Sequence, residues 1–217
     1  MLICRLRDPV NGLTHLVGVV LSVVGAVFLI YAAAQHAQAG YVVAASIFGA
    51  SLLLLYTAST LYHLLPLSDR GTAILRRVDH MMIFVLIAGT YTPLCLITLA
   101  GKWGWILLWT IWGLAAVGVA MKLFWFNAPR WFSTLFYVLM GAIVVAFLPL
   151  LSGLLSPAAV AWIAGGGILY IIGAIIYATK LPILNCSRWF GFHEVFHLFV
   201  LGGSFCHFWF IYNYVLA

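Results

Sequence analysis

The sequence has very little charge. Only 6% of its 217 residues are charged, whereas 66% are hydrophobic. A soluble domain is normally about 25% charged, so this chain has too little polar surface to cover a globule in water. The length fits one membrane domain and leaves no room for a separate soluble one. Acidic residues are the scarcest charged type, with four Asp and Glu against ten Lys and Arg.

Patterns that indicate other protein classes are also missing. The ten basic residues form no run or stripe, so we expect no nucleic-acid partner and instead a role in membrane orientation. The sequence contains no C-x-x-C pair, so a disulfide framework is not expected. We find no internal repeat and no low-complexity segment. The four cysteines are Cys4, Cys95, Cys186 and Cys206.

Seven apolar stretches are separated by charges, prolines and glycines. Each is long enough to cross a bilayer as a helix, and lipid offers backbone N–H and C=O groups no partner outside the helix itself. The sequence therefore predicts an all-α integral membrane protein, with one seven-transmembrane-helix domain over residues 1–217. The expected helices are approximately 12–35, 41–65, 76–99, 103–122, 131–152, 157–178 and 192–215.

The basic residues between these stretches predict the orientation of the bundle. Nine of the ten fall on one side, and Lys102 alone falls on the other. Positively charged loops stay in the cytoplasm. We therefore expect a multi-pass protein of the cell membrane with a cytoplasmic N-terminus and an outside C-terminus. The nine are Arg5, Arg7, Arg70, Arg76, Arg77, Lys122, Arg130, Lys180 and Arg188.

Polar residues inside the expected helices gather at one depth, near the cytoplasmic end. Random placement would scatter them over both leaflets, and ionisable residues within a membrane are costly and are functional candidates. They are Ser59 and His63 in the second helix, Asp79 in the third, and His193 and His197 in the seventh. Asn11 and His15, in the first helix, are secondary polar residues at the same level.

Three of these residues suit a zinc ion. His193 and His197 share one helix face, so they can hold a metal together with His63. Imidazole is a good zinc ligand, and a catalytic zinc keeps three protein ligands and an open position for water. Asp79 would hold or deprotonate that water, and Ser59 would hydrogen-bond it. Zinc lowers the pKa of bound water to about 7, which would make zinc hydroxide the nucleophile.

Each of these signals also has a simpler explanation. The H-x3-H pair could bond to backbone, headgroups or each other. Ser59 alone is typical of helix packing, and Asp79 alone is typical of a partner for arginine or an acid that complements a helix dipole. A triad of Ser59, His63 and Asp79 is a further alternative, but it leaves the H-x3-H pair unused. The common depth of the whole set favours a metal.

Four segments resemble the bacterial haemolysin III proteins, part of the wider progestin and adipoQ receptor family to which the adiponectin receptors are distantly related. They are "DPVNGLTHLVG" (8–18), "STLYH" (59–63), "RRVDHMMIF" (76–84) and "HEVFHLFVLGG" (193–203). The resemblance implies seven helices with the N-terminus inside. It also implies a zinc held by His63, His193 and His197, with Asp79 and Ser59 near the metal water.

The first motif of the family departs from its usual form here. The family has E-x3-N-x3-H; Asn11 and His15 match, but Arg7 stands at the Glu position. We expect the neighbouring Asp8 to face another way and to be a poor substitute. Two polar residues of the last helix are given no role: Glu194, which points about 100° from the histidine pair, and His207, roughly 15 Å along the axis from His197.

Distant relatives of the adiponectin receptor type imply an enzyme. We expect a zinc-dependent intramembrane hydrolase of lipid amides, similar to a ceramidase, that acts in membrane lipid homeostasis. Its partners would be membrane lipids and a lipid-amide substrate, and a homo-oligomer is compatible with the sequence. The alternative is a non-enzymatic regulator or sensor of membrane state with a structural zinc. A pore-forming haemolysin ranks below both, because the chain lacks an amphipathic pore-forming segment.

Overall fold

The computed structural model describes residues 6–125, 127–180, 182–184 and 190–217. All regular secondary structure in these residues is helical. The α-helices are α1 (Pro9–Ala33), α2 (Ala39–Leu64), α3 (Asp69–Pro93), α4 (Gly101–Phe124), α5 (Arg130–Ala142), α6 (Leu148–Leu154), α7 (Pro157–Thr179) and α8 (Phe192–Phe210). Short π- or 3-10-helical segments extend or join them: η2 (Leu94–Thr98), η3 (Ile143–Phe147), η4 (Pro182–Leu184) and η5 (Ile211–Val215).

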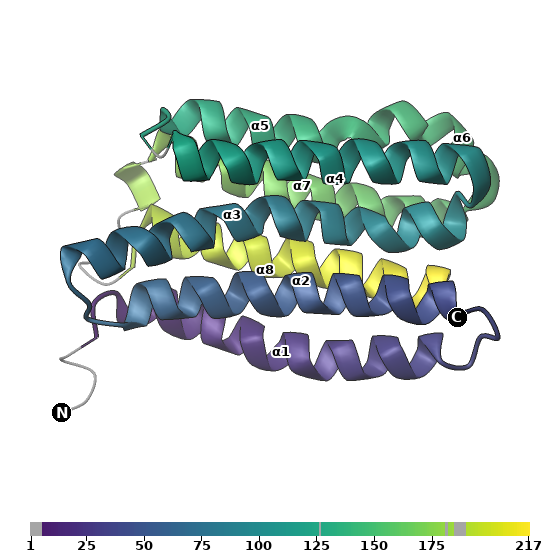
Figure 1. Cartoon of the computed structure of the whole chain (residues 1–217), viewed down its shortest axis with the longest axis horizontal. Helices are drawn as coiled ribbons and strands as arrows, with labels where there is room; N and C mark the ends of the chain where they lie inside the picture. Colours follow the sequence, from purple (N-terminus) through teal and green to yellow (C-terminus); the bar gives the residue numbers. More distant parts are fainter. Residues whose placement is uncertain (1–5, 126, 181, 185–189) are drawn as a thin grey trace.

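These elements form seven spans within the described residues. Because η3 joins α5 to α6, residues 130–154 form one span, and seven helices are long and apolar enough to cross a membrane. The all-α seven-helix prediction is therefore confirmed. The described chain begins at one end of the bundle and Ala217 lies at the other (Figure 1), as an odd number of spans requires. Which end faces the cytoplasm remains a prediction.

The third span begins at Asp69 instead of near residue 76. The Ser68 hydroxyl accepts a hydrogen bond from the Gly71 N–H at 3.3 Å. Such a cap satisfies one of the free N–H groups at a helix start, so the helix continues through polar residues that hydropathy alone assigned to a loop. Arg5, Arg188, Cys4 and Cys186 lie outside the described residues.

Helix geometry changes beside two prolines inside spans. Pro93 precedes the π-helical η2, and Pro149 follows the 3-10-helical η3. Proline lacks the N–H that continues the helix ladder, and free backbone groups are costly in lipid. At η3 the Tyr91 hydroxyl donates to the Gly141 carbonyl at 2.6 Å and accepts from the Val144 N–H at 2.8 Å. One side chain from α3 thus satisfies backbone groups beside η3.

The packing order places α8 between α1 and α7. In addition, α1 packs on α2, α2 on α3, α3 on α4, and α5 on α7. Gly18 permits the close approach of α1 to α2, because a Cβ there would lie 2.5 Å from the Tyr56 ring. The start of α8 lies beside α1, where Glu194 bonds to Asn11, and beside the end of α2, where His193 meets His63.

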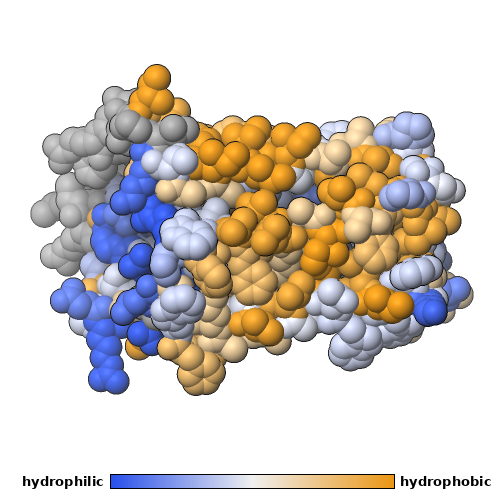
Figure 2. All heavy atoms as spheres, turned by 90° about the horizontal axis from the view of Figure 1, so that it is seen from above, coloured by the Kyte–Doolittle hydropathy of each residue, from blue (hydrophilic) through white to orange (hydrophobic). Residues whose placement is uncertain are grey.

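The outer surface of the bundle is apolar, as a surface against lipid should be. Side chains such as Tyr31 and Trp109 are each 70% exposed. Figure 2 shows an apolar band along the middle of one face and hydrophilic residues gathered mainly towards one end. Exposed apolar surface of this extent is typical of a membrane-embedded protein. The chain is a multi-pass integral membrane protein.

Candidate metal centre

Three histidines meet at one end of the bundle. His63 comes from the last turn of α2, and His193 and His197 come from the first two turns of α8. One ring nitrogen from each lies within 4.8 Å of the other two. The Nε2 atoms of His63 and His193 are 3.4 Å apart. Two nitrogens of a tetrahedral zinc with bonds of about 2.0–2.1 Å would be about 3.4 Å apart, so this spacing suits a metal ion.

Two of these rings have their other nitrogen occupied. His63 Nδ1 lies 3.2 Å from Asp8 Oδ2. His197 Nδ1 lies 3.3 Å from the Asn11 carbonyl oxygen and 3.4 Å from Thr14 Oγ1. A metal-binding histidine typically donates its second N–H to a carboxylate or carbonyl, which fixes the ring and leaves the first nitrogen free for the ion. The donor set and its supporting groups therefore fit a metal.

Asp8 lies against the site, so the expectation that it faces another way is wrong. It precedes α1, where helix periodicity does not fix side-chain direction, and its N–H donates to the His63 carbonyl at 2.9 Å. Arg7 contacts the same carboxylate at 3.0 Å and lies 4.2 Å from the Tyr62 ring centre. The hydrogen bond from His63, together with Arg7, holds the pKa of Asp8 below its usual value despite partial burial.

Glu194 ties the start of α8 to α1. Its Oε1 accepts from Asn11 Nδ2 at 2.6 Å, and its Oε2 accepts from the Gly191 N–H at 2.7 Å. A glutamate three residues into a helix commonly reaches back to the N-cap N–H. That signal was present in the sequence and could have given Glu194 a role. Its effect is to hold the first turn of α8, which carries His193, against α1.

His15 also belongs to this cluster. Its ring is stacked on His197 with centroids 3.6 Å apart and an angle of 8°, and it meets Tyr56 edge-on at 5.0 Å. It is 3% exposed, and neither of its ring nitrogens has a hydrogen-bond partner among the described residues. His15 therefore packs against a candidate ligand without belonging to the group of three. His207 lies elsewhere, stacked on Tyr170 at 5.5 Å.

Ser59 and Asp79 lie together beside the histidines. Ser59 is 1% exposed and sits one turn before His63 on α2, and Asp79 comes from α3 and lines the same cavity as Ser59. Within the described part of the chain, the His63 ring makes hydrogen-bond contacts with Asp8 and His193. This arrangement does not favour a triad of Ser59, His63 and Asp79.

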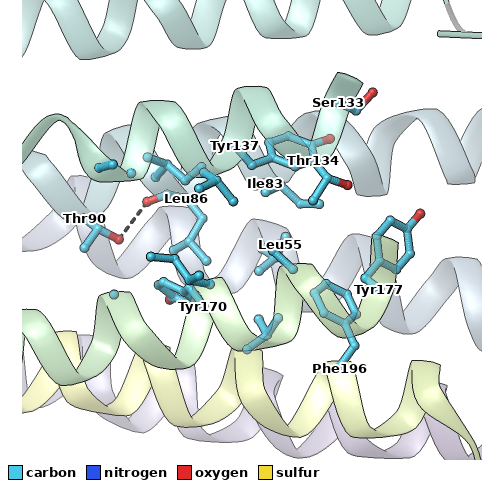
Figure 3. A pocket seen from close by; sticks show the side chains of 18 of the residues that line it. Leu55, Ile83, Leu86, Thr90, Ser133, Thr134, Tyr137, Tyr170, Tyr177 and Phe196 are labelled. Carbon is cyan, nitrogen blue, oxygen red and sulfur yellow. Dashed lines mark hydrogen bonds between the residues drawn. The ribbon is translucent and has the colours of Figure 1, made fainter. Parts of the chain in front are cut away.

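A cavity of about 720 Å³ adjoins the cluster, and Ser59, Asp79, His193 and His197 line it. It extends between α3, α5, α7 and α8 as far as His207. Figure 3 shows aliphatic side chains such as Leu86 in its middle and hydroxyl-bearing residues towards its ends. A cavity of this size, apolar with a few polar groups, is typical of a small-molecule site.

Comparison with known proteins identifies the family. A family model described as "Haemolysin-III related" matches residues 4–208 of the 217. The chain belongs to the haemolysin III family. The resemblance inferred from the four motifs is thus confirmed, and the match covers every candidate site residue.

Curated relatives of this haemolysin III protein are bacterial and animal. It is 43% identical over 214 residues to Hemolysin-3 of Bacillus cereus, which covers 97% of this chain and 92% of the relative. It is 40% identical over 199 residues to a Hemolysin-3 homolog of Bacillus subtilis, covering 91% and 89%. A 26% match over 185 residues to the human monocyte to macrophage differentiation factor, covering 80% and 71%, supports the wider progestin and adipoQ receptor family.

Proposed function

We propose that this haemolysin III protein is a zinc-dependent hydrolase of lipid amides that acts within the membrane in lipid homeostasis. The observation that carries the proposal is the meeting of three imidazoles, from His63, His193 and His197, beside a largely apolar cavity. Chemistry on a lipid needs both a polar reactive centre and space for an acyl chain. The cavity of about 720 Å³ lies within the range of about 300–1,000 Å³ that small-molecule sites occupy.

Two residues of the cavity wall, Asp79 and Ser59, would take part in the reaction. A zinc ion bound by the three histidines would lower the pKa of a water molecule to about 7 and polarise a carbonyl. Asp79 would take the proton from the attacking water and pass it to the leaving amine. Ser59 would donate its hydroxyl hydrogen to the amide oxygen as negative charge develops there. Both side chains line the cavity.

Release of fatty acid from a panel of lipid amides tests the proposal. The purified full-length protein is incubated with the panel, and products are quantified by mass spectrometry. Asp79→Asn should keep the zinc and lose about 10²- to 10⁴-fold in rate, the usual contribution of a general acid–base. Asp69→Asn is the matched control, because Asp69 is an exposed acid on the same helix. His193→Ala should lose both zinc and activity.

Two results would count against the hydrolase. One is a preparation with one zinc per chain that releases no fatty acid from any amide in the panel. The other is an Asp79→Asn protein as active as the parent. Either would leave a metal protein without the proposed chemistry.

The second candidate is a regulator or sensor of membrane state in which the zinc is structural. The candidate ligands come from α2 and α8, and Asp8, Asn11 and Glu194 already tie the starts of α1 and α8 to each other and to α2. A metal would fasten this end of the bundle. This alternative predicts that chelation of the metal lowers the unfolding temperature. It also predicts that cells carrying Asp79→Asn have the same phenotype as cells carrying the parent protein.

Pore formation ranks third. The two bacterial relatives carry the name hemolysin. The candidate functional residues of this chain, however, lie at one end of the bundle, whereas a pore needs polar groups along a whole helix face.

A further inference from the structure

Lys122 is a buried cation without an acidic partner among the described residues. It lies at the end of α4, is 4% exposed, and donates from Nζ to the Ser133 hydroxyl at 2.5 Å. A buried charge is normally paired, and an ionisable residue inside a membrane protein is a functional candidate. Lys122 plays no part in the chemistry assigned above.

Two arginines line the same cavity as Lys122. Arg130, the first residue of α5, donates from Nη1 to the Tyr177 carbonyl at 3.3 Å, and its guanidinium lies 4.7 Å from the centre of the Tyr177 ring. Arg76 lines the cavity from α3. Lys122 bonds to Ser133, which lies one turn after Arg130 on α5, and all three cations line one cavity.

The charge of this region is unbalanced. Three basic side chains line the cavity, and among the described residues the carboxylate that lines it is that of Asp79. The N-terminus of α5, where Arg130 lies, adds partial positive charge from its free N–H groups. The region is therefore complementary to an anion.

The rest of the cavity determines what kind of anion fits. Away from the basic end, aliphatic side chains line it, among them Leu55 and Leu86 (Figure 3). A free inorganic ion would leave this apolar space unused, whereas a lipid with a charged headgroup would fill both parts. His193 and His197 lie on the wall of the same cavity, so such a lipid would lie beside the candidate metal centre.

We propose that Lys122, Arg130 and Arg76 bind the carboxylate or phosphate of an anionic lipid amide, such as an N-acyl amino acid, whose acyl chain occupies the cavity. The role of these three residues in binding a substrate rests on the proposed hydrolase. Their binding of an anionic lipid does not require that the lipid be hydrolysed. It narrows the substrate class from lipid amides in general to those with a negatively charged headgroup.

The test compares two ligands that differ in charge and share an acyl chain and an amide. N-oleoylglycine carries a carboxylate, and N-oleoylethanolamine carries a hydroxyl. Affinities for the purified full-length protein are measured in detergent by calorimetric titration, with and without a chelator that prevents turnover. The parent should bind the carboxylate ligand about 10- to 100-fold more tightly, since hydrogen bonds to charged groups contribute about 1.5–3 kcal/mol each.

Lys122→Met should reduce this preference at least tenfold and leave binding of the neutral ligand unchanged. Lys102→Met is the matched control, because Lys102 is exposed at the other end of the same helix, and it should keep the full preference. Arg130→Gln is a second variant, and a smaller preference there supports the proposal even if Lys122→Met does not fold.

Other outcomes overturn the proposal. Equal affinity of the parent for the two ligands would do so, and so would an unchanged preference in both Lys122→Met and Arg130→Gln. Displacement of N-oleoylglycine by millimolar inorganic phosphate would indicate a site for free anions instead of lipid. Tighter binding of N-oleoylglycine without hydrolysis of any lipid amide would contradict the hydrolase and leave the anion site standing. Hydrolysis with equal affinity for the two ligands would contradict the anion site and leave the hydrolase standing.

Discussion

Replacing Asp8 with alanine should weaken zinc binding about tenfold. The carboxylate accepts from His63 Nδ1 at 3.2 Å, the contact that fixes the ring with Nε2 towards the other histidines. Loss of such a supporting group typically costs 10- to 100-fold in metal affinity. We expect a loss at the lower end of this range, because the Asp8 side chain is 41% exposed and also forms an ion pair with Arg7.

The assay is competition for zinc between the purified protein and a chelator of known affinity. Asp8→Glu should recover part of the loss by restoring a carboxylate, and Asp8→Asn should fall between parent and alanine, because an amide oxygen can still accept from Nδ1. Asp69→Ala, at an exposed acid at the start of α3, is the control for a change in net charge. Zinc affinity in Asp8→Ala equal to that of the parent would refute the supporting role of Asp8.

Three further predictions concern stability. Gly18→Ala should lower the free energy of unfolding in detergent by about 1–3 kcal/mol, because the new Cβ would lie 2.5 Å from the Tyr56 ring. Gly113→Ala is its control and should leave that free energy unchanged, because the space around Gly113 is open. Tyr91→Phe should cost about 1–3 kcal/mol by leaving the Gly141 carbonyl and Val144 N–H without their partner, and Tyr31→Phe, 70% exposed, is its control; equal unfolding temperatures for the two variants would contradict the account. In metal-free protein, the pKa of Asp8 lies below its unfolded value of about 3.9, so the stability that Asp8 contributes is present above that pH and is lost as pH falls through the folded pKa. Denaturant titrations should therefore show a lower free energy of unfolding for Asp8→Ala than for the parent at pH 6, and equal values near pH 2.

The fold was accessible from sequence because each span is a long apolar run, and lipid leaves such a run few conformations other than a helix. The grouping of His63, His193 and His197 was accessible for a related reason. Alternate helices run in opposite directions, so residues at corresponding helix ends share one depth, and the i, i+4 rule places the α8 pair on one face.

Other features depend on geometry that periodicity does not encode. Asp8 lies just before α1 and reaches His63 from a non-helical backbone, so a face assigned by helical period was wrong. The Asn11–Glu194 bond joins residues 183 apart in sequence. The cavity is space left between helices that are not neighbours along the chain, so no local pattern marks its basic end around Lys122.

We expect His63, His193 and His197 to bind one zinc ion. The metal content of the purified protein by elemental analysis, combined with anomalous scattering at the zinc edge from crystals, tests this directly. The parent should contain one zinc per chain, within bonding distance of the three imidazoles, and His193→Ala should contain none. A parent protein without metal, or a His193→Ala protein with a full complement of zinc, would contradict it.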